Sequence, residues 1–190
     1  MKMAKALLVT IVTIVSLLTT SASQALVLAT PPAFDTNNSD AWFNLAQAIK
    51  TSSDKFIQIL AYGYGGDVEM LHQFTNAIQD AQIKGKLIEI IVVYPAWSAS
   101  AMMVCYADKV TFQKDGELNY HRPFEVEYRN GKAIYPKMKD RVYPELDSYE
   151  LDSFKKCIDK GLLSNEGYAN VIDKKGAKYK NGRTILTDNF

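Results

Sequence analysis

Hydrophobic and polar residues recur at regular spacing in the first half of the chain and predict alternating strands and helices. Residues 55–62 alternate between apolar and polar side chains, which predicts a strand. Residues 68–84 place apolar side chains at helical spacing, and Gly85 ends that predicted helix. Residues 87–94 are rich in isoleucine and valine and predict a second strand, buried on both faces.

Further elements follow from the same patterns. An extended lead-in is predicted at residues 26–40, and helices are predicted at 41–50, 146–160 and 165–173. Strands are predicted at 108–112 and 118–121, and a hairpin arm around Asn130-Gly131 at 124–132. A strand–helix–strand–helix order favours parallel strands covered by helices. We therefore predict an α/β fold, with no internal repeat or linker to divide it.

The first 25 residues have the three-part pattern of a secretory signal peptide. Lys2 and Lys5 give a basic start, residues 6–18 are apolar, and small or polar residues follow. Cleavage is expected after Ala25, with Ala22 as the alternative, which leaves 26–190 as one domain. The apolar run is shorter than the roughly 20 residues that a membrane span needs. We expect a periplasmic or secreted protein, and an uncleaved membrane anchor is the other interpretation.

Charge and cysteine content exclude some classes of function. The 22 basic and 21 acidic residues nearly cancel, which argues against a nucleic-acid-binding protein. The basic run at 174–183 is expected to be solvated surface. Too few Cys and His residues gather to form a metal site, so no metal or cofactor is expected. An oxidising compartment permits a Cys105–Cys157 disulfide, but we favour free thiols because Cys105 lies in an apolar stretch and buried free cysteine is common.

A serine, a histidine and a glycine pair carry the candidate chemistry. Ser98 follows the second strand and begins a helix, where unpaired backbone N–H groups favour negative charge. His121 is one of two histidines, and a hydroxyl becomes a good nucleophile when an imidazole takes its proton. Each of these alone has an ordinary structural explanation: Ser98 as a helix cap, His121 as a core residue, and Gly65-Gly66 as a tight turn. Their order and spacing together indicate a serine hydrolase.

Four short segments in register resemble the Clp protease family of serine peptidases. They are Tyr64-Gly65-Gly66-Asp67-Val68, Ala96-Trp97-Ser98-Ala99, Ala107-Asp108-Lys109-Val110 and Leu118-Asn119-Tyr120-His121-Arg122-Pro123, with 23 residues from the serine to the histidine. The likeness covers residues 55–125 and extends to the wider group with the same superhelix, which includes SppA-type signal-peptide peptidases. It implies the ββα superhelix of the ClpP/crotonase type.

The resemblance also implies a role for each matching residue. Ser98 would attack the peptide carbonyl and His121 would transfer the proton. The backbone N–H groups of Gly66 and Ala99 would hold the oxyanion. The glycine edge would accept substrate as an added strand. Ser100 is the alternative nucleophile.

The orienting acid of a triad has no clear counterpart. Two alignments of the C-terminal part point to Asp159 or to Asp173, and the acid can also be absent. We therefore predict an exported serine peptidase that cleaves peptides or unfolded polypeptide without an ATP-driven unfoldase, with a homo-oligomer expected from the resemblance. The alternatives are a binding or scaffold protein that has lost catalysis and an acyl-CoA enzyme of the crotonase type.

Overall fold

The computed structural model describes residues 25–129 and 132–188, which form a mixed α/β fold. Seven strands of the described residues form the main sheet, in the order β1-β2-β3-β5-β8-β9 with β4 beside β3. Its strands are β1 (Leu26–Ala29), β2 (Phe56–Gly63), β3 (Leu87–Trp97), β4 (Lys109–Phe112), β5 (Leu118–His121), β8 (Gly176–Lys180) and β9 (Arg183–Thr187). The pairs among β1 to β5 are parallel, whereas β8 and β9 are antiparallel to their neighbours.

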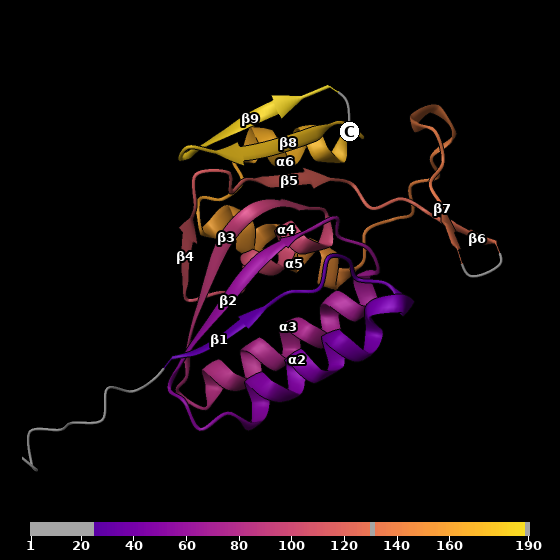
Figure 1. Ribbon diagram of the computed structural model, residues 1–190. Helices are drawn as coiled ribbons and strands as arrows, with labels where there is room; N and C mark the ends of the chain where they lie inside the picture. Colours follow the sequence, from indigo (N-terminus) through magenta and orange to yellow (C-terminus); the bar gives the residue numbers. More distant parts are fainter. Residues whose placement is uncertain (1–24, 130–131, 189–190) are drawn as a thin grey trace, which may run out of the picture.

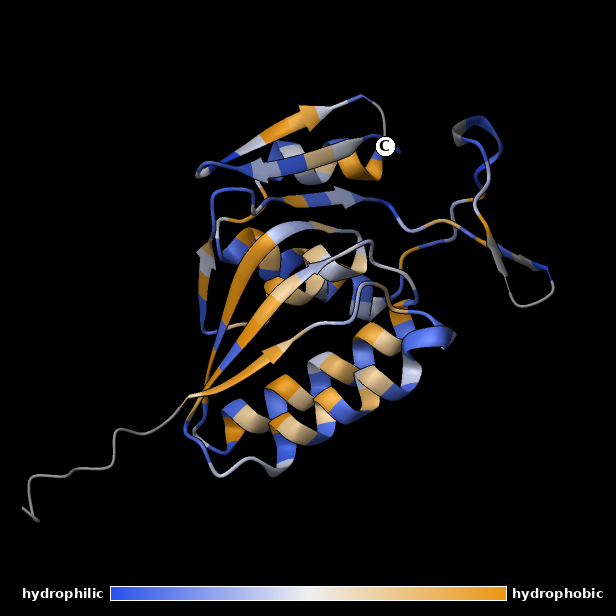
Figure 2. Ribbon diagram, viewed as in Figure 1, coloured by the Kyte–Doolittle hydropathy of each residue, from blue (hydrophilic) through white to orange (hydrophobic). Residues whose placement is uncertain are grey.

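Helices α2 and α3 lie side by side along the sheet, and α4 and α5 lie behind it (Figure 1). The helices are α2 (Ser39–Thr51), α3 (Val68–Ile83), α4 (Ala99–Val104), α5 (Ser148–Asp159) and α6 (Asn165–Ile172), with short 3₁₀ turns η1 (Thr36–Asn38) and η2 (Met138–Asp140). Strand β2 buries alternate residues, and the apolar positions concentrate on β2, β3 and the helix sides that face them (Figure 2). The period-two pattern of this strand thus produces its inner face.

Most predicted elements are confirmed, and two segments differ. The expected lead-in contains strand β1, because Leu26 and Leu28 pair in register with Ile57 and Ile59 of β2. The basic run is also more than solvated surface, since it forms β8 and the turn into β9. Lys178 and Lys180 each lie 3.0 Å from a carboxylate oxygen of the buried Glu117. Alternating lysines on one strand thus share one carboxylate, a tertiary pairing that composition does not reveal.

The two cysteines form a disulfide, so the expectation of free thiols was wrong. Cys105 caps the end of α4 and Cys157 lies in α5, and both are buried. The apolar stretch that made Cys105 resemble a core residue packs against the apolar face of α5, which carries Cys157. The bond therefore joins the helix that follows Ser98 to the C-terminal half of the chain.

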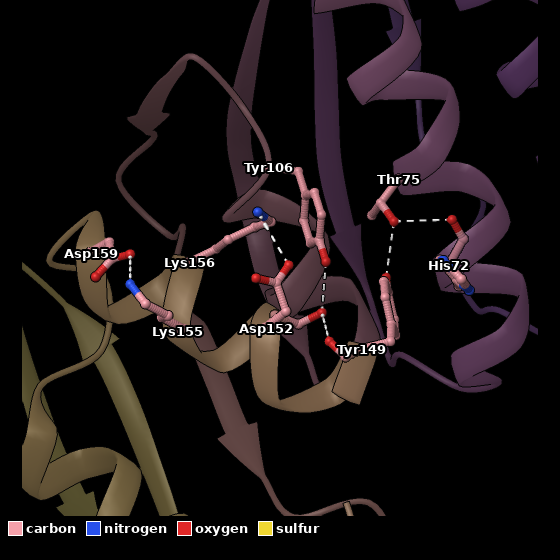
Figure 3. Close-up of polar contacts among 9 residues, drawn as sticks. His72, Thr75, Tyr106, Tyr149, Asp152, Lys155, Lys156 and Asp159 are labelled. Atoms are coloured by element: carbon pink, nitrogen blue, oxygen red, sulfur yellow. Dashed lines mark hydrogen bonds and ion pairs between the residues drawn. The ribbon is translucent and has the colours of Figure 1, made fainter. Parts of the chain in front are cut away.

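A polar network holds α5 to the neighbouring helices beside this disulfide (Figure 3). The hydroxyl groups of Tyr106 and Ser153 are 2.8 Å apart, and those of Thr75 and Tyr149 are 2.9 Å apart. Ser153 also donates to the Tyr149 carbonyl. Residues from α3, the end of α4 and α5 are thus linked by satisfied hydrogen bonds in a mostly buried region, which favours one packing arrangement.

A hairpin arm projects from the body after β5 (Figure 1). Its strands are β6 (Glu127–Arg129) and β7 (Lys132–Ile134), as the pattern predicts, and the expected turn at 130–131 lies outside the described residues. At its base, the Arg141 guanidinium lies 4.1 Å from the centre of the Phe124 ring. The expected signal peptide also falls almost wholly outside the described residues. None of the described helices has the length and apolar character to cross a membrane.

Candidate active site

Ser98 occupies a sharp turn between β3 and α4. Its backbone has φ 53° and ψ −123°, a positive φ combined with a ψ outside the left-handed helical region. Such a conformation costs about 1–3 kcal/mol and clusters at functional sites. The Ser98 N–H donates to the Asn119 carbonyl over 2.8 Å, whereas its side chain makes no capping hydrogen bond. The turn is therefore fixed through the backbone, and the hydroxyl is not used as a helix cap.

The glycine turn packs directly against the Ser98 turn. A Cβ atom on Gly65 would lie 2.5 Å from the Trp97 carbonyl oxygen and 2.6 Å from Ser98 Cβ. Gly65 also has φ 85°, which other residues rarely adopt. Only glycine permits this approach, so the pair predicted from sequence brings the two turns into contact.

Ser100 lies inside the protein. It is fully buried, and its Oγ accepts a hydrogen bond from the Gly65 N–H over 3.1 Å. Ser100 is absent from the lining of the cleft that Ser98 faces. This geometry gives Ser100 a structural role and does not support it as the alternative nucleophile.

Two backbone N–H groups beside Ser98 donate to no acceptor among the described residues. Phe34 pairs with the glycine turn: its N–H donates to the Gly65 carbonyl and its carbonyl accepts from the Asp67 N–H, both over 2.7 Å. In a parallel bridge of this kind, the N–H and C=O of Gly66 face the other side. In the part of the chain that the structure describes, neither the Gly66 N–H nor the Ala99 N–H has an intramolecular acceptor.

The pairing with Phe34 also limits how the glycine segment can bind substrate. The sequence predicts that this edge accepts an added strand, but one side of it is already occupied by the chain's own residues 32–34. The side that carries the Gly66 N–H and C=O is the side toward which an added strand could pair.

His121 ends β5 and lines the same cleft as Ser98 and Gly66. Its Nδ1 lies 2.9 Å from the Arg122 carbonyl oxygen, and its ring centre lies 5.3 Å from that of Phe124. Burial lowers the pKa of His121 below its usual 6.5; the Arg122 carbonyl opposes this shift and the charge of Arg141 adds to it. The imidazole is thus mostly neutral at pH 7, the form in which it can accept a proton.

The cleft has a volume of about 430 Å³, and both polar and apolar residues line it. Phe34 and Tyr64 line it from the N-terminal part of the chain, and Phe124, Val126 and Tyr135 line it from the arm and its base. The arm was not expected from sequence to contribute to the site. The one signal for it was its position directly after the His121-Arg122-Pro123 segment.

Two features of a formed catalytic triad are missing from the described contacts. The hydrogen bonds between described residues include none between Ser98 Oγ and the His121 ring. Both carboxylates considered from sequence are exposed elsewhere: Asp159 forms an ion pair with Lys155 on α5, and Asp173 caps the end of α6. The structure therefore brings the serine, the histidine and the glycine turn to one cleft, but does not support either aspartate as the third member. The residues described contain no cluster of metal-binding side chains.

Comparison with known proteins supports a fold and leaves the family open. No family model matches the chain, and no curated protein matches it. Among solved structures, the chain is similar to a mutant of the 1510-N membrane-bound stomatin-specific protease, with a TM-score of 0.54 and 13% sequence identity. The match covers 88% of this chain and 75% of that one. At this identity the likeness to the protease shows the fold alone.

Proposed function

We propose that this protein is an exported serine peptidase with a Clp-like ββα fold. Ser98 is the nucleophile, His121 is the general base, and the Gly66 and Ala99 N–H groups bind the oxyanion. The observation that carries the proposal is the Ser98 turn. Its backbone is strained, its hydroxyl makes no helix-capping hydrogen bond, and Ser98 lines the same cleft as His121. A nucleophile on a sharp strand-to-helix turn is a recurring design in hydrolases.

The surroundings of Ser98 support acyl transfer more than a purely structural use. Backbone N–H groups aimed at a developing oxyanion can each contribute about 3 kcal/mol to transition-state stabilisation. The contacts of Gly65 with Trp97 and Ser98 place the Gly66 segment beside the serine turn. A strained serine, free N–H donors and a neutral imidazole at one cleft form the set that serine hydrolysis requires.

The substrate we propose is a peptide or an unfolded segment bound in extended form. Gly66 offers its N–H and C=O on the side opposite Phe34, which suits pairing with an added strand. The aromatic and aliphatic residues of the lining suit apolar side chains of that segment, and the polar residues among them suit its peptide groups. Together with the signal-peptide pattern, this supports action outside the cytoplasm without ATP or an unfoldase. A homo-oligomer is part of the proposal.

A fluorophosphonate probe tests this function because it reacts only with an activated serine. We expect the wild-type protein to be labelled and Ser98→Ala to be unlabelled. Ser100→Ala should be labelled more slowly, because it removes only the acceptor for the Gly65 N–H. Cleavage of an unfolded protein substrate without ATP should follow the same order.

The controls separate loss of chemistry from loss of fold. Circular dichroism should show that both serine variants fold like the wild type. A folded wild-type protein that neither reacts with the probe nor cleaves peptide would contradict the proposal and support the binding-protein alternative. Labelling that survives in Ser98→Ala would also contradict it.

A further inference from the structure

The orienting contact of the His121 ring comes from its own chain neighbour. Arg122 precedes Pro123, and a residue before proline is held in an extended conformation. This backbone presents the Arg122 carbonyl oxygen to His121 Nδ1 at 2.9 Å. A carbonyl oxygen only accepts hydrogen bonds, so the proton of the neutral ring resides on Nδ1 and the lone pair on Nε2.

The Arg122 side chain anchors this carbonyl from the other end of the residue. Its Nη2 donates to the Pro144 carbonyl over 2.8 Å, and its Nη1 lies 3.5 Å from the Ile172 carbonyl. The guanidinium also lies 6.0 Å from the Tyr143 ring. The end of β5 is thereby tied both to the segment before α5 and to the end of α6.

One charged group that acts on the imidazole from a neighbouring segment is the cation Arg141. Arg141 lies over the Phe124 ring, which in turn contacts the His121 ring. Its charge disfavours the imidazolium form, whereas the aspartate of a triad favours it. The effect of Arg141 on His121 is thus opposite in sign to that of a triad aspartate.

We propose that the main-chain carbonyl of Arg122, anchored by the Arg122 guanidinium, orients His121 in place of a carboxylate, so that Ser98 and His121 work as a dyad. This inference rests on the proposed function. His121 Nε2 takes the Ser98 Oγ proton while Oγ bonds to the peptide carbonyl carbon, whose π electrons move to the oxygen. Nε2–H then gives the proton to the amine nitrogen as the C–N bond breaks. Water then attacks the acyl-enzyme carbonyl as Nε2 takes one of its protons, and Nε2–H returns the proton to Ser98 Oγ as the acyl–Oγ bond breaks and the carboxylic acid leaves. Nδ1–H stays bonded to the Arg122 carbonyl throughout, which makes Arg122 a positioning residue.

Nitrogen NMR of the histidine rings tests the orientation directly. The chain has two histidines, so a His72→Gln variant assigns the His121 signals. We expect the neutral His121 ring to carry its proton on Nδ1 in the wild type, in Asp159→Asn and in Asp173→Asn. A ring protonated on Nε2, or a tautomer that changes in either aspartate variant, would overturn the inference.

Kinetics with the same variants test the dyad. Loss of a triad acid lowers kcat about 10⁴-fold, so unchanged kcat in Asp159→Asn and Asp173→Asn supports the inference and a fall of that size in either refutes it. Both aspartates are exposed, so these variants are expected to fold. Arg122→Ala should lower kcat by about 10- to 100-fold with KM unchanged, as supporting residues do, and Arg122→Lys should retain part of the rate. An Arg122→Ala protein that keeps full kcat contradicts the anchoring role.

The two proposals fail in different ways. If no variant cleaves peptide or reacts with a fluorophosphonate, the peptidase function fails. The NMR measurement needs no turnover, so an Nε2-protonated ring in an active enzyme refutes the Arg122 role and leaves the peptidase standing.

Discussion

Reduction of the Cys105–Cys157 disulfide should destabilise the protein by several kcal/mol. The two cysteines are 52 residues apart in sequence. In the chain-entropy model, a loop of that length restricts the unfolded chain by about 4 kcal/mol. For a protein of this size, each kcal/mol corresponds to about 2–4 °C in Tm, so a fall of about 8–16 °C is expected.

Urea unfolding with and without reductant measures this effect on an unchanged sequence. Both cysteines are buried, so the reduced sample is prepared by unfolding and refolding in reductant. The buried Trp42 provides a fluorescence signal. The double variant Cys105→Ala/Cys157→Ala serves as the control, since reductant should not change its stability.

The size of the difference decides the outcome. A free-energy difference below about 1 kcal/mol would refute the idea that the bond restricts the unfolded chain as the entropy model requires. An equal response of the double variant would show that the reductant acts on something other than this bond. Because Cys105 ends the helix that follows Ser98, the reduced protein should also react more slowly with a fluorophosphonate.

Two further predictions concern the glycine turn and a buried carboxylate. Gly65→Ala should lower the rate of probe labelling by about 100-fold or more, the effect of losing an oxyanion donor, because its Cβ would collide with Trp97 and Ser98. Gly85→Ala is the matched control: Gly85 has a similar φ of 80° with nothing within 4 Å of the added Cβ, so equal loss of labelling in both variants would refute the contact argument. The hydrogen bond from Lys109, with further bonds from Gln58 and Thr111, lowers the pKa of Glu89 from 4.5 to about 2. Because the folded-state pKa is lowered, ionised Glu89 stabilises the folded protein above pH 4.5, and this stabilisation is lost as the pH falls toward 2. The free energy of unfolding of the wild type should therefore fall by up to about 3 kcal/mol more than that of Glu89→Gln over this range. The same pH dependence in both proteins would contradict this.

The parallel core was predictable because each of its elements follows from a local pattern. Strands 55–62 and 87–94 and the helix between them need only the periodicity of their own residues. The segments that pattern analysis missed are stabilised by distant partners. Strand β1 exists because it pairs with β2, and the lysines of β8 are held by Glu117 from the end of a different turn. Neither partner is visible in the local sequence.

The candidate site divides in the same way. Ser98, His121 and the glycine pair were found because each stands at a junction between predicted elements. The prediction of free thiols was wrong and the third triad member was left open, because both depend on how α5 and α6 pack on the first half of the chain. A main-chain carbonyl that orients a histidine cannot be recognised from residue types, because every residue has one. Only Pro123 indicated the extended conformation of Arg122.

The position of the Ser98 hydroxyl depends on contacts from three separated parts of the chain. Asn119 accepts from the Ser98 N–H, Gly65 packs on its Cβ, and Phe34 holds Gly65 from the opposite side. A strained residue persists only when its surroundings determine it more strongly than its own preference does. Relaxation of any one of these contacts should therefore let Ser98 return to an ordinary helix cap. Because the position of Ser98 depends on these distant contacts, Ser98 and the glycine pair taken singly resemble an ordinary helix cap and an ordinary tight turn.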